Sequence, residues 1–449
     1  MSDGEESLKS FANTLFNVSD AVLSEIIDDS LNGLGSKQER FNVESNEGKI
    51  NENIFMKKNQ VEGHLTVGLK VVNKELLFYS ELMPLVKEVC STKNYPLSEQ
   101  QLQKMIAKFH GHFVSNSHHH QIFEDFSNDF SVFFSHSEVQ ALTVIKNLAI
   151  FHGCMHAFKA GRSDHLTTMF PLTGKDYLLA PENKPFLEPF YNGGFRDALA
   201  VAEITCMSIC MEENVSSLVK EKVSIVPDQA TEVISAVKFL RDNVPDALEL
   251  LCKVNALANE DMSCLIHGDF HPLNVAVSHD GMVKLFDFQL VRYSDGLNDL
   301  HQYISQGCSP KMMRENTASI QEAYHTSLTE TCRLLGMAGS PYGDDYDFLK
   351  RFKSFSPRQV ILGLSFQLWK SSDHITEQVW QKFEELRKKL SGIRDVNFKT
   401  DAWVAAAEEI FVIVDSLGPK IWEGVQLIID LIIEFKRNGT LDAILELPV

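Results

Sequence analysis

Residues 264–291 read CLIHGDFHPLNVAVSHDGMVKLFDFQLV. The apolar run 275–277, the Asp-Gly turn signal at 280–281 and the apolar residues that follow are typical of a β-hairpin. Three polar side chains, Asp269, Asn274 and Asp287, flank this hairpin. The pattern predicts that these three side chains lie together near one end of it.

Such a set of side chains suits the transfer of a phosphoryl group to a hydroxyl. A carboxylate can accept the proton of the hydroxyl, and magnesium, which neutralises a triphosphate, prefers oxygen ligands. Protein kinases space these parts as His-x-Asp-x-x-x-x-Asn, with a metal-binding Asp on a later strand. Here His267 and Asp269 precede Asn274 at that spacing, and Asp287 follows in an apolar setting. A His-Gly-Asp triplet alone is common, but the joint pattern favours a kinase-like catalytic loop over coincidence.

The composition is that of a folded protein with an acidic balance. The chain has 449 residues, of which 44% are hydrophobic and 23% charged, and its formal net charge is −19. The length allows two or three lobes. The charge argues against nucleic acid or an anionic membrane as a partner, because both need basic patches. The acidic start is unlike a signal peptide, no apolar run is long enough to span a membrane, and the cysteines are scattered. We expect a cytoplasmic monomer with reduced thiols.

The first 50 residues predict helix and then strand. Apolar side chains over 6–31 fall at roughly helical spacing, which predicts one or two amphipathic helices. The sequence Asn-Gly-Leu-Gly-Ser at 32–36 precedes a strand predicted over 39–43. A Gly-rich turn before a strand can bring backbone amides close to phosphate, and it can equally be an ordinary turn.

A lysine and a glutamate follow on consecutive predicted elements. Residues 53–58 predict a short strand, and a helix is predicted around Glu75. A strand lysine paired with a helix glutamate positions the α- and β-phosphates in kinases, so Lys57 and Glu75 are the candidates. Lys58 should face the other side of the strand, because side chains alternate. Lys70 lies only five positions before Glu75, which makes it a neighbour on the helix. The alternative is that all three lysines are solvated.

The middle of the chain holds a predicted lobe boundary. Three consecutive histidines at 118–120 are interpreted as a solvated loop, with a metal site as the weaker alternative. Residues 122–126 have the character of a strand leaving the small lobe, so the boundary is predicted near 126. The sequence Ser-His-Ser-Glu at 135–138 predicts a capping box for a helix that runs to about 158.

The rest of the chain reads mainly as helix. The aromatic stretch 170–200 is interpreted as irregular, either lining an acceptor pocket or covering the core. Helices are predicted over about 198–222 and 228–257, and Ser356-Pro357 predicts a helix start. Two C-terminal helices, about 401–417 and 419–437, are predicted on either side of Gly418-Pro419.

With these residues placed, the chain resembles the ecdysteroid kinase-like group of small-molecule kinases, relatives of choline kinase and the aminoglycoside phosphotransferases. The resemblance covers about residues 30–370. It is carried by the motifs IFMK (54–57), ELLFY (75–79), IFEDF (122–126), LAIFH (148–152), HGDFHPLN (267–274), FDFQ (286–289) and DL (299–300).

The resemblance implies an α+β, two-lobed protein-kinase-like fold. A small β-containing N-lobe with the N-terminal helices, on the nucleotide side, would span residues 1–126. A large, mainly helical C-lobe with the catalytic loop and the C-terminal helices would span 127–449.

The resemblance also implies roles for the residues of the catalytic loop and hairpin. Asp269 would be the catalytic base, and His267 would brace the loop rather than react. Asn274 and Asp287 would hold Mg²⁺.

On the nucleotide side, Lys57 would bind the phosphates of ATP with Glu75 as its partner. The hinge that receives adenine would consist of Glu124, Asp125 and Phe126.

Two features depart from the pattern of the group. The segment 33–57 is short, so the first strands and the Gly-rich loop are expected to be compressed. His271 stands where the group usually has Trp, as in the aminoglycoside enzymes.

Two functions stay open at this point. The first is an ATP-dependent phosphotransferase that phosphorylates a hydroxyl group of a small molecule, such as an ecdysteroid, another sterol-like compound or a choline-like alcohol. The presence of all three residues, Asp269, Asn274 and Asp287, favours it. The alternative is a catalytically inactive binding module with a kinase fold, which the compressed first strands favour.

Overall fold

The chain forms two compact units in the computed structural model. The first comprises Met1–Asn183, Asn259–Leu300 and Ser319–Asp344, and the second comprises Lys184–Ala258, His301–Ala318 and Asp345–Val449. Every site residue predicted from the sequence belongs to the first unit. The residues that the structure describes are 3–16, 21–26, 37–45, 51–62, 64–92, 102, 104–115, 117–162, 164, 171–174, 176–211, 217–372 and 377–447.

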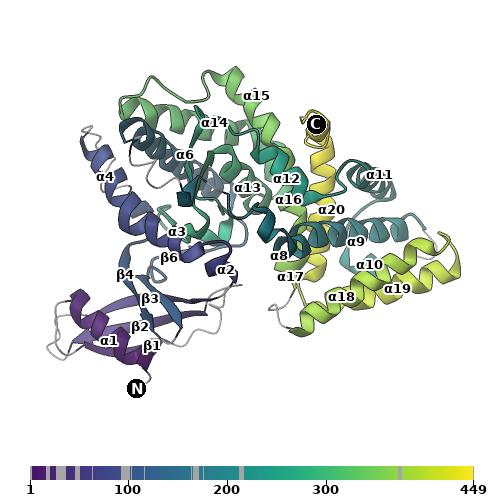
Figure 1. Cartoon of the computed structure of the whole chain (residues 1–449). Coiled ribbons are helices and arrows are strands. Elements are labelled where there is room, and N and C mark those ends of the chain that lie inside the picture. Colours follow the sequence, from purple (N-terminus) through teal and green to yellow (C-terminus); the bar gives the residue numbers. More distant parts are fainter. Residues whose placement is uncertain are drawn as a thin grey trace. The chain divides into compact units, whose positions relative to one another are not determined.

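The first unit begins with a helix on an antiparallel sheet. Helix α1 (Asp3–Phe16) lies against the sheet (Figure 1). The strand order is β1-β2-β3-β5-β4, and the strands are β1 (Ala21–Ile26), β2 (Lys37–Ser45), β3 (Asn51–Gln60), β4 (Phe109–Ser115) and β5 (His118–Glu124). Apolar residues of α1 and of one sheet face form a core: Leu8, Ala12, Phe41, Val43, Ile54, Met56 and Ile122.

Alternation along β3 separates this core from the other sheet face. Ile54 and Met56 belong to the core under α1, so Lys57 and Asn59 point to the opposite face. Both of these polar side chains are buried there. The chain then continues through α2 (His64–Val67), α3 (Val71–Leu77), a π-helical turn (Phe78–Leu82) and α4 (Met83–Thr92).

The remainder of the first unit surrounds the predicted hairpin. Helix α6 (Glu138–Gly161) precedes it in the chain, and Pro181–Asn183 forms a 3₁₀ turn. Two small sheets, ordered β6-β8-β9 and β10-β7, consist of β6 (Phe130–Val132), β7 (Ser263–Ile266), β8 (Val275–Ser278), β9 (Val283–Leu285) and β10 (Arg292–Asp295). Two 3₁₀ turns, Pro272–Asn274 and Phe288–Leu290, precede β8 and β10 respectively. Helices α13 (Leu297–Gly307) and α14 (Pro310–Leu334) follow, and each belongs partly to the first unit and partly to the second.

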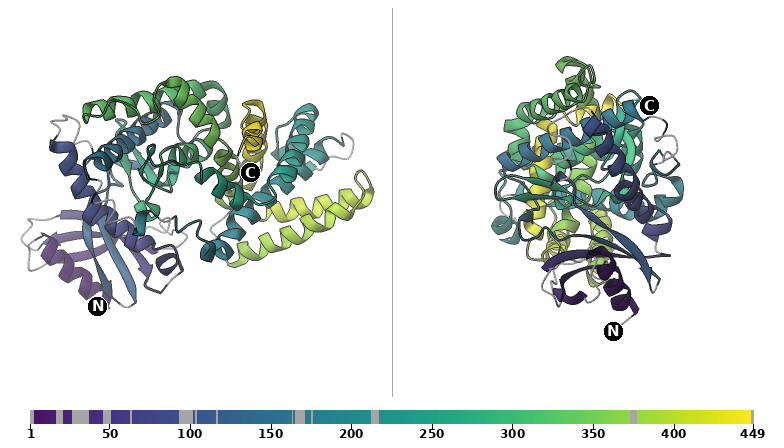
Figure 2. Two further views of the ribbon diagram at one scale, coloured as in Figure 1. Left: turned by 45° about the horizontal axis from the view of Figure 1, so that its top comes forward. Right: turned by 90° about the vertical axis from the view of Figure 1, so that its left-hand side faces the viewer.

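Among its described residues, the second unit has helices as its regular secondary structure and no strand. Helices α18 and α19 lie side by side in it, as the yellow-green pair of Figure 2 shows. Its helices are α8 (Lys184–Glu188), a π-helical turn (Pro189–Gly193), α9 (Gly194–Ile209), α10 (Ser217–Lys222), α11 (Pro227–Asn243), α12 (Ala247–Asn255), α15 (Asp345–Phe355), α16 (Pro357–Ser365), α17 (Gln367–Ser371), α18 (Glu377–Gly392), a 3₁₀ turn (Ile393–Asp395), α19 (Asp401–Asp415), α20 (Ile421–Arg437) and α21 (Asp442–Leu445).

The structure corrects the prediction for the first 31 residues. Helix α1 ends at Phe16, and residues 21–26 form strand β1, which pairs with β2. Pairing with β2 satisfies the backbone of this apolar segment as a strand, which outweighs its helical spacing. Since the sheet has a first strand upstream of residue 33, the expected compression of the first strands is wrong. The Gly-rich sequence 32–36 lies outside the described residues.

Other boundaries also differ from the predictions. His118, His119 and His120 belong to strand β5 and not to a loop, because they pair with β3 and β4. The capping box of α6 is made by Ser137 and Gln140, two residues later than predicted. The stretch predicted as irregular is helical from Lys184 onward, and each of the helices predicted over 198–222 and 228–257 is two helices. The helix start at Ser356-Pro357 and the C-terminal pair α19 and α20 are confirmed. Among the described helices, none has the length and apolar character needed to cross a membrane.

Candidate active site

The loop after β7 is held by one buried carboxylate. Asp299, on α13, accepts the backbone N–H of His267 at 2.7 Å and that of Gly268 at 2.9 Å. Gly268 has a φ of +85°, and a Cβ on it would lie 1.9 Å from the carbonyl oxygen of Leu290. Only glycine fits there. Arg292 secures the same peptide by donating to the Gly268 carbonyl at 2.8 Å.

His267 ties the loop to the return strand of the hairpin. Its Nδ1 accepts the Asp269 N–H at 3.3 Å, and its Nε2 lies 2.9 Å from the carbonyl oxygen of Phe286. A ring with these two partners carries its proton on Nε2 and is neutral. Burial lowers the pKa of His267, in agreement with that state. Both ring nitrogens are therefore engaged in holding the loop.

Asp299 is itself embedded in a buried network. His152, on α6, lies 3.1 Å from Asp299 through Nε2 and 2.8 Å from the Tyr324 hydroxyl through Nδ1. Burial alone raises the pKa of Asp299, but the hydrogen bond and charge of His152 bring it below its ordinary value. Asp299 is thus a carboxylate that accepts several hydrogen bonds and fixes the loop to two helices.

Asn274 and Asp287 occupy the same end of the hairpin, as predicted. Asn274 directly precedes β8, and the Phe286 N–H donates to its carbonyl at 3.3 Å. The side-chain amide of Asn274 donates to the Asp269 carbonyl at 2.9 Å, which joins the hairpin to the loop. Asp287 follows with a φ of +64°, a left-handed conformation that is uncommon for non-glycine residues and that Asp adopts more readily than most.

Lys57 brings together groups that are far apart in the sequence. Its Nζ donates to Glu75 at 3.0 Å, to Asp287 at 2.6 Å and to the side-chain oxygen of Gln289 at 3.2 Å. The side chains of Lys57 and Glu75 are 6% and 2% exposed, whereas that of Asp287 is 23% exposed. Of the three charged side chains in this cluster, Asp287 is the one that solvent reaches. Lys70, the rival lysine, precedes α3 in a left-handed conformation.

The net charge of this cluster depends on whether Glu75 is ionised. Burial favours the neutral amine of Lys57, but the carboxylates of Asp287 and Glu75 outweigh it and raise its pKa. Burial also raises the pKa of Glu75, with Lys57 opposing. With all three groups ionised, the cluster holds one ammonium against two carboxylates. In that state it carries net negative charge where Asp287 meets solvent, and protonation of Glu75, whose pKa burial raises to about 7, removes that charge.

A stack of aromatic rings supports Asp287 from behind. Phe288 is fully buried, and its ring lies 4.4 Å from that of His267 and 3.7 Å from that of Phe78, centroid to centroid. Tyr79 packs edge-on against it at 5.8 Å. The rings connect the loop after β7 to the π-helical turn that continues the helix of Glu75.

The predicted hinge residues bond to the sheet and the hairpin rather than to the Lys57 cluster. The Glu124 carboxylate accepts Lys284 Nζ at 2.6 Å and the Lys108 N–H at 2.8 Å. The Asp125 N–H donates to the Asn53 carbonyl at 3.2 Å. Among the described residues, no hydrogen bond uses the N–H of Phe126, the third residue of the predicted hinge.

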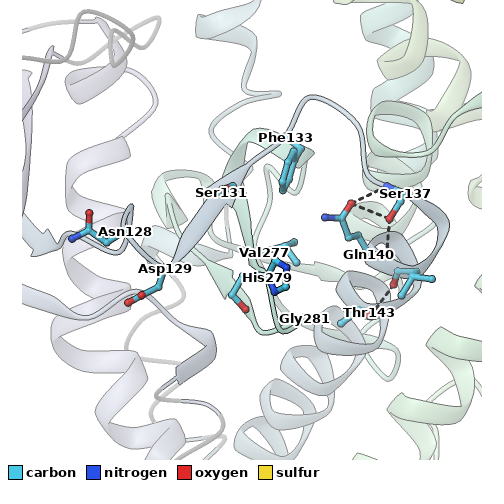
Figure 3. Close-up of a pocket in the computed structure, with 12 residues that line it drawn as sticks. Asn128, Asp129, Ser131, Phe133, Ser137, Gln140, Thr143, Val277, His279 and Gly281 are labelled. Atoms are coloured by element: carbon cyan, nitrogen blue, oxygen red, sulfur yellow. Dashed lines mark hydrogen bonds between the residues drawn. The ribbon is translucent and has the colours of Figure 1, made fainter.

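A separate pocket of about 540 Å³ lies at the other end of the hairpin (Figure 3). The hairpin turn contributes His279 and Gly281, strand β6 contributes Ser131, and the first turn of α6 contributes Gln140. Because Asp269, Asn274 and Asp287 lie at the opposite end of β8 and β9, this pocket is not the place where a substrate meets them.

Sequence reasoning missed three residues of this site. Gln289 shares Lys57 with the two carboxylates, Asp299 carries the loop, and Arg292 bonds to Gly268. Gln289 and Asp299 lie within the motifs FDFQ and DL. The sequence therefore marks these two residues as part of a motif. Their partners lie more than 20 positions away, so their contacts are visible only in the structure.

With this geometry in place, comparison with known families gives the class of protein. The model of the ecdysteroid kinase-like family matches residues 38–337, well over half of the chain. The protein belongs to the ecdysteroid kinase-like family, and the kinase-like fold class predicted from its sequence is confirmed.

Several solved structures are similar to the chain at low sequence identity. Spectinomycin phosphotransferase APH(9)-Ia, solved with ADP and spectinomycin, is 10% identical with a TM-score of 0.39, covering 95% of this chain and 98% of that one. Plasmodium vivax ethanolamine kinase is 10% identical with a TM-score of 0.36, covering 87% and 81%. Aminoglycoside phosphotransferase APH(3'')-Id of Streptomyces rimosus, solved with ADP and streptomycin, is 13% identical with a TM-score of 0.30, covering 81% and 99%. Comparison with curated proteins found no match.

Proposed function

We propose that the protein is an ATP-dependent phosphotransferase that phosphorylates a hydroxyl group of a small molecule. One observation carries the proposal: Lys57 Nζ contacts both Glu75 and Asp287 within hydrogen-bond distance, while Asn274 joins the hairpin to Asp269. Phosphoryl transfer depends on positioning and charge neutralisation, and this arrangement supplies groups for both. Family membership adds ecdysteroid-like, other sterol-like and choline-like alcohols as candidate acceptors.

The donor set fits magnesium. The side-chain amide nitrogen of Asn274 donates to the Asp269 carbonyl, so the side-chain oxygen of Asn274 faces away from that bond. One carboxylate oxygen of Asp287 accepts from Lys57, which leaves the other oxygen for a cation. Mg²⁺ binds through one or two such oxygens together with substrate phosphates and water. Asn274 and Asp287 would hold Mg²⁺, which neutralises phosphate charge when bound.

The chain's own residues have distinct tasks in the reaction. The acceptor oxygen attacks the γ-phosphorus, the bond to the β-phosphate oxygen breaks, and the acceptor proton passes to Asp269. Lys57 orients the phosphates with Glu75 as its counter-charge. The segment from Glu124 to Phe126 receives adenine, and the Phe126 N–H offers a donor that the described residues do not use.

The test is a nucleotide titration with and without Mg²⁺, followed by a screen for ATP consumption over hydroxylated metabolites. Saturable Mg²⁺-dependent ATP binding with turnover on at least one alcohol supports the proposal. Binding without turnover on any acceptor, including water, supports the inactive binding module instead.

Asp269→Asn provides the sharpest test of the catalytic role. The amide is isosteric but cannot take a proton, so turnover should fall by about 100- to 10,000-fold. Nucleotide affinity and melting temperature should stay close to wild type, because Asp269 does not belong to the Lys57 cluster. Wild-type turnover in the purified variant means that Asp269 is not the base.

A further inference from the structure

We propose that the outer edge of strand β6 and the pocket beside it form a docking site for an extended, basic segment of a partner protein. The site is independent of the proposed function, because the pocket lies at the end of the hairpin opposite to Asp269 and Asp287. Three features of this region support it: the direction of the backbone groups of β6, the pocket that borders the strand, and the charges around both.

Strand β6 lies at an open edge of its sheet. In the order β6-β8-β9, β8 is the only described strand that pairs with it. The opposite edge is covered, because Leu285 of β9 accepts the Ala107 N–H at 3.0 Å. An edge strand presents N–H and C=O groups with which another chain can pair.

The pairing within the sheet shows which backbone groups of β6 face outward. On β8, the Ser278 N–H donates to the Met282 carbonyl at 2.9 Å, so the backbone groups of Ser278 face β9. These groups alternate in direction along a strand, so those of Val277 face β6 and its partner there, Ser131. The N–H and C=O of the next residue, Val132, therefore point away from β8. Outside the strand ladders, no backbone hydrogen bond among the described residues involves Val132.

The pocket of Figure 3 borders this strand along its length. Its lining includes Asp129 before β6, Ser131 within it and Phe133 after it. Side chains alternate along a strand, so Ser131 and Phe133 share the face that Val132 does not. In a strand added beside β6, the two residues that flank the partner of Val132 would project over this same pocket face. One bound segment can therefore pair with the edge and fill the pocket.

The same region exposes several apolar side chains together. Val132, Phe133 and Phe134 are consecutive and 45%, 37% and 65% exposed, and Val139 on α6 is 75% exposed. Single exposed apolar residues are ordinary on a monomer, whereas a contiguous group marks an interaction site. Because Phe133 and Val139 also line the pocket, they offer apolar contact to a side chain that enters it.

Charge determines which side chain the pocket accepts. Asp129 is an exposed carboxylate of the lining, and Glu138 and Asp280 are sequence neighbours of lining residues. Among the described residues of the lining, none is Lys or Arg. A Lys or Arg side chain suits this pocket, since its stem is apolar and its end is cationic. A second copy of the chain suits it poorly, because pairing two β6 edges brings two acidic rims together at a net charge of −19 per chain.

The probe is a displayed library of random seven-residue peptides, selected on the intact chain. We expect enriched peptides that combine β-branched residues with Lys or Arg, and labelled copies should bind saturably in fluorescence anisotropy. The bound peptide should slow hydrogen exchange of the Val132 amide. No enrichment, enrichment of acidic peptides, or an unchanged exchange rate at Val132 overturns the inference.

Two substitutions at one position test the edge contact. Val132→Pro removes the outward N–H, and proline is tolerated on an edge strand where that N–H faces solvent. Affinity for the enriched peptide should fall about 3- to 10-fold, as for the loss of one hydrogen bond. Val132→Thr is the matched control, because it keeps the N–H and the β-branched shape. Wild-type affinity in the Pro variant, or an equal loss in both variants, overturns the edge contact.

Asp129→Asn tests the pocket, since it removes the charge of the lining carboxylate and keeps its size. Basic peptides should lose affinity and salt dependence in this variant, and unchanged binding overturns the role of charge.

A change to the peptide tests the same edge if Val132→Pro lowers the melting temperature. N-methylation removes one peptide N–H at a time, and the loss of affinity should alternate along the peptide, because only every second N–H of an added strand faces β6. Equal losses at all positions overturn the pairing. Sedimentation of the chain alone provides the last comparison. A dimer that Val132→Pro converts to monomer would show that a second copy occupies the edge, and it overturns the assignment to a partner segment.

Discussion

Two buried lysines, Lys57 and Lys74, show how the surroundings of a side chain determine its charge state. Lys57 has two carboxylates within 3.0 Å, and its pKa is raised. Lys74 precedes Glu75 on α3 and is 1% exposed, and its Nζ lies 5.1 Å from the centre of the Tyr177 ring. Burial lowers the pKa of Lys74 to about 8, with Asp176 opposing. Lys57 is a permanent cation, whereas Lys74 titrates in an accessible range.

Lys57→Met should weaken ATP binding by about 10-fold or more, because a hydrogen bond to a charged group is lost. Lys58→Met and Lys70→Met are matched controls that should leave the affinity near wild type. Lys58 faces the opposite side of β3, and Lys70 precedes α3 outside the cluster. A calorimetric titration of all three variants decides the assignment. A loss confined to Lys70→Met assigns the phosphate contact to that lysine instead.

Lys74 should make stability increase with pH between about 8 and 10.5. In this window the unfolded chain still holds the proton that the folded chain has released, so the free energy of unfolding rises with pH. The contribution is complete above 10.5 and lost as the pH falls through 8. It amounts to at most about 3 kcal/mol. The measurement is the difference in denaturation midpoint between wild type and Lys74→Met across this window. A difference that does not vary with pH contradicts the lowered pKa.

At the scale of elements, the hairpin β8–β9 depends on the loop before it and on strand β10. Gly268 and Gly281 lie at its two ends with φ of +85° and +84°. A Cβ at Gly281 meets nothing within 4 Å, whereas one at Gly268 meets the Leu290 carbonyl. The same backbone conformation is thus combined with open space at one end and with close packing at the other.

Gly281→Ala should cost about 1 kcal/mol of stability, which is the strain of a left-handed alanine. Gly268→Ala should cost clearly more and also reduce turnover, because the loop must move away from Leu290, at the end of the 3₁₀ turn Phe288–Leu290, to relieve the contact. Melting temperature and ADP release of the two variants give the comparison. Equal effects on both quantities would show that close packing at Gly268 is unimportant.

Local patterns were sufficient to predict the elements that carry the site, but not all the elements that surround it. The spacing around Asp269 and Asn274 and the apolar strand before Lys57 are short-range signals, and the structure has the hairpin and strand that they indicate. Strand β1 was predicted as helix because only its pairing with β2 distinguishes the two. The contacts of Asp299 and Gln289 join residues that are distant in the sequence, so no local pattern predicts them.

At the scale of the whole molecule, charge sets the conditions for binding a nucleotide. The chain has 61 acidic residues against 42 Lys and Arg, so it repels polyphosphate at long range. Salt screens that repulsion within about 8 Å at physiological ionic strength. The local cluster of Lys57, Glu75 and Asp287 is also net negative above about pH 7, where Glu75 is ionised. Charge repulsion therefore opposes the binding of a free triphosphate. A divalent cation, which neutralises negative charge on both the phosphates and the site, makes binding favourable.

Nucleotide affinity should accordingly rise by about 10-fold or more when Mg²⁺ is added, and Asp287→Ala should remove that increase. Asp287 is the charged group of the cluster that solvent reaches, and it directly follows Phe286, whose N–H bonds to the Asn274 carbonyl. Asp280→Ala is the matched control, because it removes one carboxylate from the turn end of the same hairpin and changes the net charge equally. Isothermal titrations with ATP, in Mg²⁺ and in chelator, measure both effects. If both variants keep the Mg²⁺ dependence of wild type, Asp287 is not the cation ligand. If both lose it, the overall charge and not the site controls binding.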